Sequence, residues 1–560
     1  MKEMIGLGPH IHIKCPKTMD NQMNLENKPN KRKIIKIGKS LQLIIEIPDL
    51  PESAMAKRFD LSSLHFMSLQ ALAMRRFAVQ LCCHRKMLAY AVQTDSAARR
   101  QKEHETTMYD LLKDLLTEVP LPPSMKHELF SLMKSVSREI IKWLDLHEDY
   151  LGPCNLNEME NLKHLCWTSL GSVDYRETVA ALIRHEKLDL TQRYKLACLY
   201  CLEEDIRELW RKMPEKSKKS YYDVKSAILE QPDLAVIWTF IIKGEVKKIL
   251  RYLKENGKFS PSINHLGFEC SAILGYRTAA QYFYEKLKSE EKEELLIKTS
   301  MSVAMQRSKD YYFYMEERQE SGDVLFYLMS VMQLYEQKIL FSHFPCETLK
   351  CVLDWPRQDA FIELAKSEYP SISVRAYYRV LLNLSRNSSW GYNHSKLFQE
   401  FFLLDQLDFS FALVAYNIIL RDFIRSDDIE TVKFLFRHLD AQGKDEHVLV
   451  STGSFINYEL MKEGKWELMN QFIEDVKLSE SGRRRNLKLF SENRGLNHKE
   501  RILIIINESN SSVLGILEDI QDNTDLEIQE EEEIIEPKAV RKRLMPLKAA
   551  YDKCIDFLFR

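Results

Sequence analysis

Glycine and proline are scarce in this chain, with 17 of each among 560 residues. A protein built from many short strands needs more of these turn residues, so their scarcity argues against an all-β fold. Leucine, lysine and glutamate, which all favour helices, dominate instead. Hydrophobic residues at 45% and charged residues at 29% are typical of a folded chain rather than a disordered one. We therefore predict an all-α fold.

The chain also lacks a strong net charge. Its 80 lysines and arginines face 82 aspartates and glutamates, which leaves −2 at pH 7. No global field therefore draws it to nucleic acid or to a membrane surface. The best local basic patch, Arg483–Arg485, is interpreted as a solvated loop rather than an RNA site. We do not expect nucleic acid as a partner, although an RNA-binding protein of unfamiliar helical fold stays open as an alternative.

Segments typical of secreted or membrane proteins are missing as well. The start, MKEMIGLGPHIHIK, lacks the apolar core of a signal peptide. The most apolar stretch, residues 401–420, contains Asp405, Gln406 and Asp408 and is expected to form a buried core helix. The cysteines, eleven in number, follow no disulfide framework and indicate a reducing compartment. We expect a cytoplasmic protein with no membrane partner. The nucleus stays open because Lys31–Lys33 could serve as an import signal.

Motifs of catalysis and cofactor binding are absent from the sequence. There is no phosphate-binding G-x-x-x-x-G-K-[ST] loop, no G-x-G-x-x-G, no G-x-S-x-G and no H-E-x-x-H. Cys198 and Cys201 have CxxC spacing, but they lie in an apolar helical run without a second pair at zinc spacing. We interpret both as core residues. We predict no metal, no cofactor and no small-molecule substrate, and we do not expect an enzyme, although an enzyme of unfamiliar helical fold is a further alternative.

Four regions differ in their sequence pattern. Residues 1–55 contain several prolines and are expected to be irregular and partly disordered, with a hairpin around Gly38 as one alternative. Residues 56–150 predict an N-terminal helical domain. Residues 151–525 predict a helical-repeat array, and residues 526–560 an acidic linker followed by a C-terminal helix.

The repeat prediction depends on a recurring apolar template. An apolar residue is followed by apolar residues three, four and seven positions later, with starts at Ile206, Val246, Ala280, Val324, Val432, Met469 and Val513. Three turn-forming residues, Gly275, Asp427 and Gly464, each lie five residues before a start, where a positive φ is tolerated. Paired helices of this kind bury their apolar faces by stacking on their neighbours, which predicts an elongated α-solenoid. Unrelated amphipathic helices in one irregular domain would give the same template, and this alternative stays open.

The segment from Leu266 to Leu287 resembles an ankyrin repeat. Five residues carry the resemblance, at the family's small-residue pair and at its Val and Leu-Leu positions: Ser271, Ala272, Ala280, Phe283 and Tyr284. The family's Thr-Pro-Leu-His is replaced by LGFE in this chain. The resemblance implies a solenoid of divergent ankyrin-like helix pairs. It also implies a non-catalytic scaffold or adaptor that binds an unidentified protein partner.

Two N-terminal segments, Ser68–Leu81 and Val119–Met133, resemble the two halves of a SOCS box. This resemblance implies a substrate adaptor of a cullin ubiquitin ligase. Three residues of the first segment would dock the elongin adaptor and three of the second would face the cullin: Leu69, Leu72 and Phe77, then Leu121, Pro122 and Pro123. The alternative is a helical domain that contains a proline-rich turn.

Overall fold

The computed structural model describes residues 32–37, 41–46, 68–93, 102–151, 162–184, 188–221, 233–256, 260–310, 319–368, 372–387, 392–404, 413–441, 455–456, 459–460 and 463–465. Arg483–Arg485 and residues 526–560 lie outside this part of the chain. Two compact units divide the chain. The first (unit 1) comprises residues 1–372 with 390–392, and the second (unit 2) comprises residues 373–389 with 393–560.

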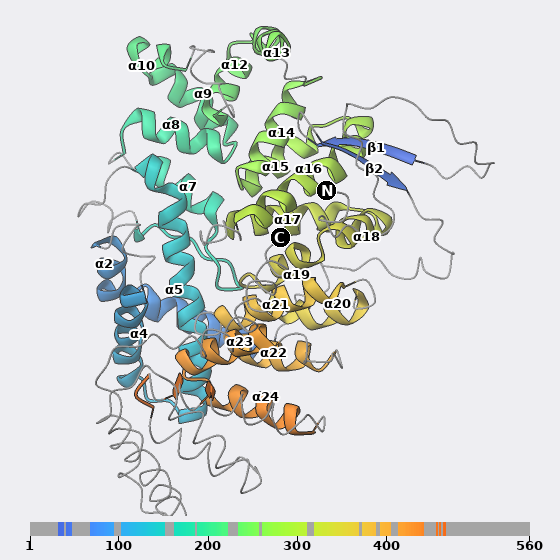
Figure 1. Ribbon diagram of the computed structural model, residues 1–560. Coiled ribbons are helices and arrows are strands. Elements are labelled where there is room, and N and C mark those ends of the chain that lie inside the picture. The colour runs from blue at the N-terminus through green and yellow to red at the C-terminus, as the bar shows by residue number, and fades with distance from the viewer. Residues whose placement is uncertain are drawn as a thin grey trace, which may run out of the picture. The chain divides into compact units, whose positions relative to one another are not determined.

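The described residues are mostly helical, as predicted (Figure 1). Unit 1 contains α1 (Leu69–Cys82), α2 (Arg85–Gln93), α4 (Lys102–Thr117), α5 (Pro123–Leu151), α7 (Tyr175–Arg184), α8 (Leu190–Leu199), α9 (Glu203–Lys212), α10 (Glu215–Lys219), α12 (Leu234–Ile242), α13 (Val246–Glu255), α14 (Ile263–Ile273), α15 (Arg277–Glu285), α16 (Ser289–Asp310), α17 (Gln319–Val331), α18 (Leu334–His343), α19 (Pro345–Leu353), the 3₁₀ turn η4 (Gln358–Ala360) and α20 (Phe361–Glu368). Unit 2 contains α21 (Val374–Arg386), α22 (His394–Phe402), α23 (Leu413–Arg425) and α24 (Ile429–Ala441).

A two-stranded hairpin precedes the helices. β1 (Arg32–Ile37) pairs antiparallel with β2 (Leu41–Glu46), so that Arg32 lies opposite Glu46 and Ile37 opposite Leu41. The hairpin alternative is therefore confirmed for these strands, and the expected turn at Gly38 lies outside the described residues.

The N-terminal helices pack on α5. Both α1 and α4 lie against α5, and α2 contacts α4. Proline begins α5, where its missing N–H costs no helical hydrogen bond. One face of α5 is fully buried through Leu129, Val136, Ile140 and Trp143. Because α5 also contacts α8, it belongs to the same packed unit as the helices that follow it.

Four helix pairs share one type of turn: α8 with α9, α12 with α13, α14 with α15, and α23 with α24. In each turn one residue has a positive φ, and the next residue donates its N–H to the carbonyl five positions earlier. The φ values are 52° at Cys201, 70° at Gly244, 86° at Gly275 and 65° at Asp427. The corresponding N···O distances are 3.0, 3.0, 2.9 and 2.9 Å. This bond satisfies a carbonyl at the end of the first helix and reverses the chain within a few residues. Gly464 has a φ of 70° and lies in the same kind of bond, from Lys465 to Leu460 at 2.8 Å.

The apolar pattern follows these turns in a fixed register. The fifth residue after each turn is buried: Ile206, Ile249, Ala280 and Val432. Val246, the template start in α13, lies only two residues after Gly244 and is half-buried, whereas Ile249 is fully enclosed. Asp189, Asp233 and Ser262 cap the first helices of the three pairs in unit 1, each accepting an N–H of the first turn.

The first helices of the pairs in unit 1 pack side by side. α8 contacts α12, α12 contacts α14, and α14 contacts α16 (Figure 1). Seven consecutive residues of α12, Leu234–Phe240, are buried, as expected for a helix that is apolar on all sides. In unit 2, the stretch expected to form one core helix at residues 401–420 instead supplies the end of α22 and the first part of α23. None of the helices in the described part of the chain combines the length and the hydropathy needed to cross a bilayer.

Candidate functional site: a buried ionic cluster

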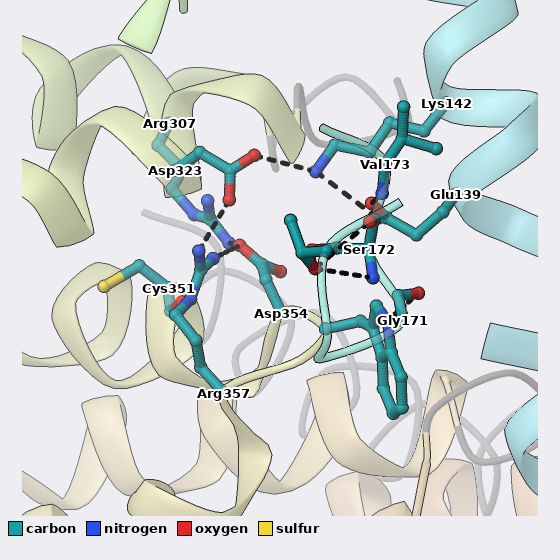
Figure 2. Close-up of polar contacts among 12 residues, drawn as sticks. Glu139, Lys142, Gly171, Ser172, Val173, Arg307, Asp323, Cys351, Asp354 and Arg357 are labelled. Carbon is teal, nitrogen blue, oxygen red and sulfur yellow. Dashed lines mark hydrogen bonds and ion pairs between the residues drawn. The ribbon is translucent and has the colours of Figure 1, made fainter. Parts of the chain in front are cut away.

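Six charged side chains from distant parts of unit 1 meet in its interior (Figure 2). We call them the ionic cluster: Glu139 and Lys142 of α5, Arg307 of α16, Asp323 of α17, and Asp354 and Arg357, which follow α19. Three are acids and three are bases, so their formal charges cancel.

The ionic cluster forms a chain of alternating charges. Lys142 Nζ donates to Asp323 Oδ2 at 3.0 Å and lies 3.9 Å from Glu139 Oε1. Arg357 Nη1 donates to the other oxygen of Asp323 at 2.6 Å, and its Nη2 lies 3.6 Å from Asp354 Oδ2. That Asp354 oxygen also accepts from Arg307 Nη2 at 3.2 Å. The chain thus links α5 to α16, α17 and the segment after α19.

A loop between α5 and α7 completes the surroundings. The N–H of Val173 donates to Glu139 Oε2 at 3.4 Å, and Trp355 Nε1 donates to the carbonyl of Gly171 at 3.0 Å (Figure 2). Gly171 has a φ of 78°, which favours glycine there. Arg357 Nε donates to the carbonyl of Cys351 at 3.1 Å. Backbone groups therefore hold Glu139, at one end of the ionic cluster, and Arg357, near its middle.

Gly322 makes the close approach of the charges possible. A Cβ at this position of α17 would lie 2.0 Å from Asp354 Oδ2 and 2.1 Å from Arg307 Nη1. Both distances are far below van der Waals contact, so a larger residue would displace the ion pair. Glycine in the middle of a helix is otherwise unfavourable. Its presence here follows from the ionic cluster.

Burial and the neighbouring charges shift the pKa values of the ionic cluster. Burial opposes ionisation of Asp323, but Lys142 and Arg357 more than offset it, and the pKa of this carboxyl lies well below its usual range. Burial likewise disfavours the charged form of Lys142, yet Asp323 and Glu139 raise its pKa above the usual value. Burial raises the pKa of Glu139 despite the nearby Lys142. Asp323 and Lys142 are therefore held as an ion pair across the neutral range.

Arg75 connects α1 to the same region. Its side chain is 4% exposed, and its Nη1 donates to the carbonyl of Leu170 at 2.9 Å. The guanidinium lies over the ring of Trp355, 4.4 Å from the centroid, and 5.9 Å from that of Tyr392. Cation–π contacts of this kind are strongest when desolvated. The loop that holds Glu139 is thereby also tied to α1.

The ionic cluster is best interpreted as a device that fixes helix packing. Its acids form ion pairs with its bases and its formal charge is zero, so no excess charge is available to attract a ligand. Such clusters often contribute little net stability, but loss of one member leaves an uncompensated buried charge. The arrangement therefore favours one packing of α5 on α16 and α17 over alternatives in which the charges do not meet.

The residues predicted to dock a ubiquitin-ligase adaptor lie at the surface. Leu69 is 85% exposed, and Leu72 and Phe77 are half-buried on the same face of α1. The opposite face of α1 is buried through Met74, Ala78, Val79 and Cys82. In the second segment, Leu121 is half-buried while Pro122 and Pro123 are exposed. α1 packs on α5, the helix that begins at Pro123, so the two segments lie on contacting elements.

The CxxC cysteines are both buried in the first helix pair. Cys198 lies in α8, and Cys201 is the positive-φ residue of the turn. Burial raises the pKa of both thiols, that of Cys201 to about 12. Among the described residues there is no group of three or more His, Cys, Asp or Glu side chains suited to a metal.

Sequence patterns gave no sign of the ionic cluster. Lys142 and Asp323 are separated by 181 positions, and Arg307 and Asp354 by 47. The two local pairs, Glu139 with Lys142 and Asp354 with Arg357, have the i, i+3 spacing found on many exposed helices. The one informative signal was Gly322, a glycine directly before Asp323 in a helical apolar stretch.

In comparisons with known proteins, no family model and no curated protein matches the sequence of this chain.

Proposed function

We propose that the chain is a non-catalytic scaffold or adaptor for protein–protein interactions, built as an α-solenoid of divergent helix pairs. The observation that carries this proposal is the turn shared by the helix pairs, at Cys201, Gly244, Gly275 and Asp427. Repeated pairs of this kind stabilise one another through their interfaces, and their outer side chains can vary without loss of the fold. Binding surfaces of repeat proteins are made from such variable side chains.

The outer helices supply the candidate binding surface. α8, α12 and α14 are largely enclosed, whereas α9, α13 and α15 each bury one face and expose charged or polar side chains on the other. Arg207 and Arg211 of α9 and Gln281 and Glu285 of α15 are all exposed. A partner would therefore contact the outer helices and the turns. The side chains that it contacts would differ from one helix pair to the next.

Affinity purification of the tagged full-length chain, after nuclease treatment, tests this proposal. We expect a reproducible set of proteins that is reduced when the outer helices are altered by Arg207→Glu with Arg211→Glu, or by Gln281→Lys with Glu285→Lys. Lys113→Glu on α4 is the matched surface control, because the side chains of Lys113 and of its ion-pair partner Asp110 are both exposed. Partners that disappear with nuclease, or a set unaffected by every outer-helix change, would contradict the proposal.

A cullin ubiquitin-ligase adaptor is the second candidate function, and the outward apolar face of α1 supports it. Leu69 is the most exposed large hydrophobic residue among those described, and Phe77 lies two turns further along the same face. Co-purification of elongin and a cullin with the wild-type chain is expected. Leu69→Asp with Phe77→Asp should abolish it, whereas Lys113→Glu, at an exposed position of α4, should not. Failure of the wild-type chain to retain elongin would exclude this candidate and leave the general scaffold untouched.

A further inference from the structure

The exposed face of α13 carries an excess of positive charge. Lys247, Lys248, Arg251 and Lys254 are all exposed on a helix of 10 residues, and its buried face consists of Ile249 and Leu253. Exposed Lys243 lies one turn before Lys247, just ahead of the helix. Lys243 and Lys247, and Lys247 and Arg251, have i, i+4 spacing, at which like charges repel. We call the exposed cations of α13 the α13 basic face.

Some exposed cations on other helices have partners one helical turn away. Lys212 pairs with Glu208, Lys218 with Glu215 and Lys396 with Glu400. On α13 only Lys248 has such a pair, with Glu245 at 3.4 Å. Lys247, Arg251 and Lys254 form no ion pair with any residue in the described part of the chain. Their charges are therefore available to a molecule outside the chain.

Comparison with α9 shows that this charge pattern does not serve the helix itself. Both are second helices of a pair and both have 10 residues. α9 carries Glu203, Glu204 and Asp205 in its first turn and Arg211 and Lys212 in its last, as the helix dipole favours. α13 has no acidic residue in its first turn, where Lys247 and Lys248 stand instead. Cations at that end oppose the dipole, so α13 has an arrangement that local stability disfavours.

We infer that the α13 basic face is the docking site for an acidic peptide segment of the partner protein. This inference rests on the proposed scaffold function and specifies the chemistry of its partner. Charge complementarity is the argument: three cations at positions i, i+4 and i+7 lie along one side of a helix about 15 Å long, where successive carboxylates of a peptide can reach them. Glu245 and Glu255 border the face at its two ends and would repel any anionic chain that continued past it. A peptide can place uncharged residues beside these two carboxylates, whereas each nucleotide of a nucleic acid carries a phosphate. An acidic peptide therefore fits better than a nucleic acid.

Fluorescence anisotropy of the full-length chain with a fluorescein-labelled oligoglutamate peptide, at low salt, tests the inference. The triple variant Lys247→Gln, Arg251→Gln and Lys254→Gln should bind about tenfold more weakly and with less dependence on salt. The matched control Arg85→Gln, Lys86→Gln and Lys113→Gln removes the same charge from exposed positions of α2 and α4 and should change affinity less than about threefold. Far-ultraviolet circular dichroism should show both variants folded, since the α13 changes remove repulsion.

Three outcomes would overturn the inference. The wild-type chain could fail to bind the peptide, the two triple variants could weaken binding equally, or a labelled oligouridylate of the same charge could bind more tightly than the peptide. The first two would leave the scaffold proposal standing, because that proposal depends on recovery of partners and on the outer helices as a whole. Loss of all protein partners from the wild-type chain would instead remove the scaffold proposal.

Discussion

Replacing Lys142 by methionine isolates the energetic role of the ionic cluster. The side chain is 6% exposed and holds Asp323 at 3.0 Å with Glu139 nearby. Methionine keeps much of the apolar stem and removes only the charge, which leaves the three acids of the ionic cluster against two bases. Breaking a buried pair in this way costs about 3–5 kcal/mol. We expect Lys142→Met to lower the free energy of unfolding of unit 1 by that amount.

The double variant Lys142→Met with Asp323→Leu tests the reason for the loss. It removes one base and one acid, so the remaining Glu139, Asp354, Arg307 and Arg357 again carry no net charge. The double variant should lose less stability than the sum of the two single losses, since it restores zero formal charge to the ionic cluster, whereas each single variant leaves one charge in excess. Additive losses would show that the side chains act by packing alone and would refute the interpretation of the cluster as a coupled set.

Urea unfolding followed by tryptophan fluorescence measures these differences, because Trp143 and Trp355 both lie in unit 1 near the cluster. Lys113→Met is the surface control: Lys113 and Asp110 are 3.4 Å apart, with side chains 62% and 64% exposed. Exposed pairs contribute about 0–1 kcal/mol, so this variant should be nearly neutral. A loss for Lys142→Met no larger than that of the control would contradict the predicted role.

The difference in free energy of unfolding between Lys142→Met and Lys113→Met should be constant from about pH 5 to pH 9. The lowered pKa of Asp323 changes stability only at pH values near or below the pKa of aspartate in the unfolded chain. The raised pKa of Lys142 changes stability only at pH values near or above the pKa of lysine in the unfolded chain.

Further predictions concern single residues of unit 1. His147 is fully buried between Trp143 and Tyr200, and burial lowers its pKa to about 4. The unfolded chain therefore takes up a proton first as the pH falls below about 6.5, and the melting temperature should drop more steeply between pH 6.5 and pH 4 in wild type than in His147→Gln. Gly267→Ala places a Cβ 2.6 Å from the ring of Phe283 and should cost about 1–3 kcal/mol in urea unfolding; Gly267→Ala combined with Phe283→Leu should cost less. Gly322→Ala should displace the Asp354 carboxylate and show little additional loss when combined with Lys142→Met. At Gly275, with a φ of 86°, alanine should cost about 1–2 kcal/mol, and asparagine, which tolerates this conformation, should cost less in the same assay.

Local structure was predictable wherever one residue determines the backbone. Gly275 and Asp427, chosen because they tolerate a positive φ, do have one. Cys201 occupies the equivalent turn and could not be recognised, because cysteine has no preference for this conformation and its CxxC spacing suggests metals or redox chemistry first. In α13 the template from Val246 is filled by apolar residues, but only Ile249 and Leu253 of its four positions are buried. Periodicity alone does not say how completely each apolar position is enclosed.

The ionic cluster could not be predicted, because its members meet only after the helices have packed. Each is an ordinary charged residue in its own segment, and its burial depends on partners up to 181 positions away. Even Gly322, the most unusual of the residues involved, has a visible reason only once Arg307 and Asp354 are in place. Tertiary electrostatics of this kind leaves no periodic signal in one sequence.

The position of α5 explains why both the ionic cluster and an outer binding surface are expected in the same protein. α5 contacts α8, and His147 of α5 bonds to Tyr200 directly after α8. The carbonyl of Trp143 can only accept, so Nδ1 of His147 carries the proton and donates to it. Nε2 therefore accepts from the hydroxyl of Tyr200 at 2.8 Å. Apolar helix faces alone permit small shifts along one another, whereas charges that must meet in pairs do not. With α5 and its neighbours covering the first helices, the side chains that remain exposed belong to the second helices. Among these second helices, α13 carries the exposed charge that we propose as the contact for an acidic partner segment.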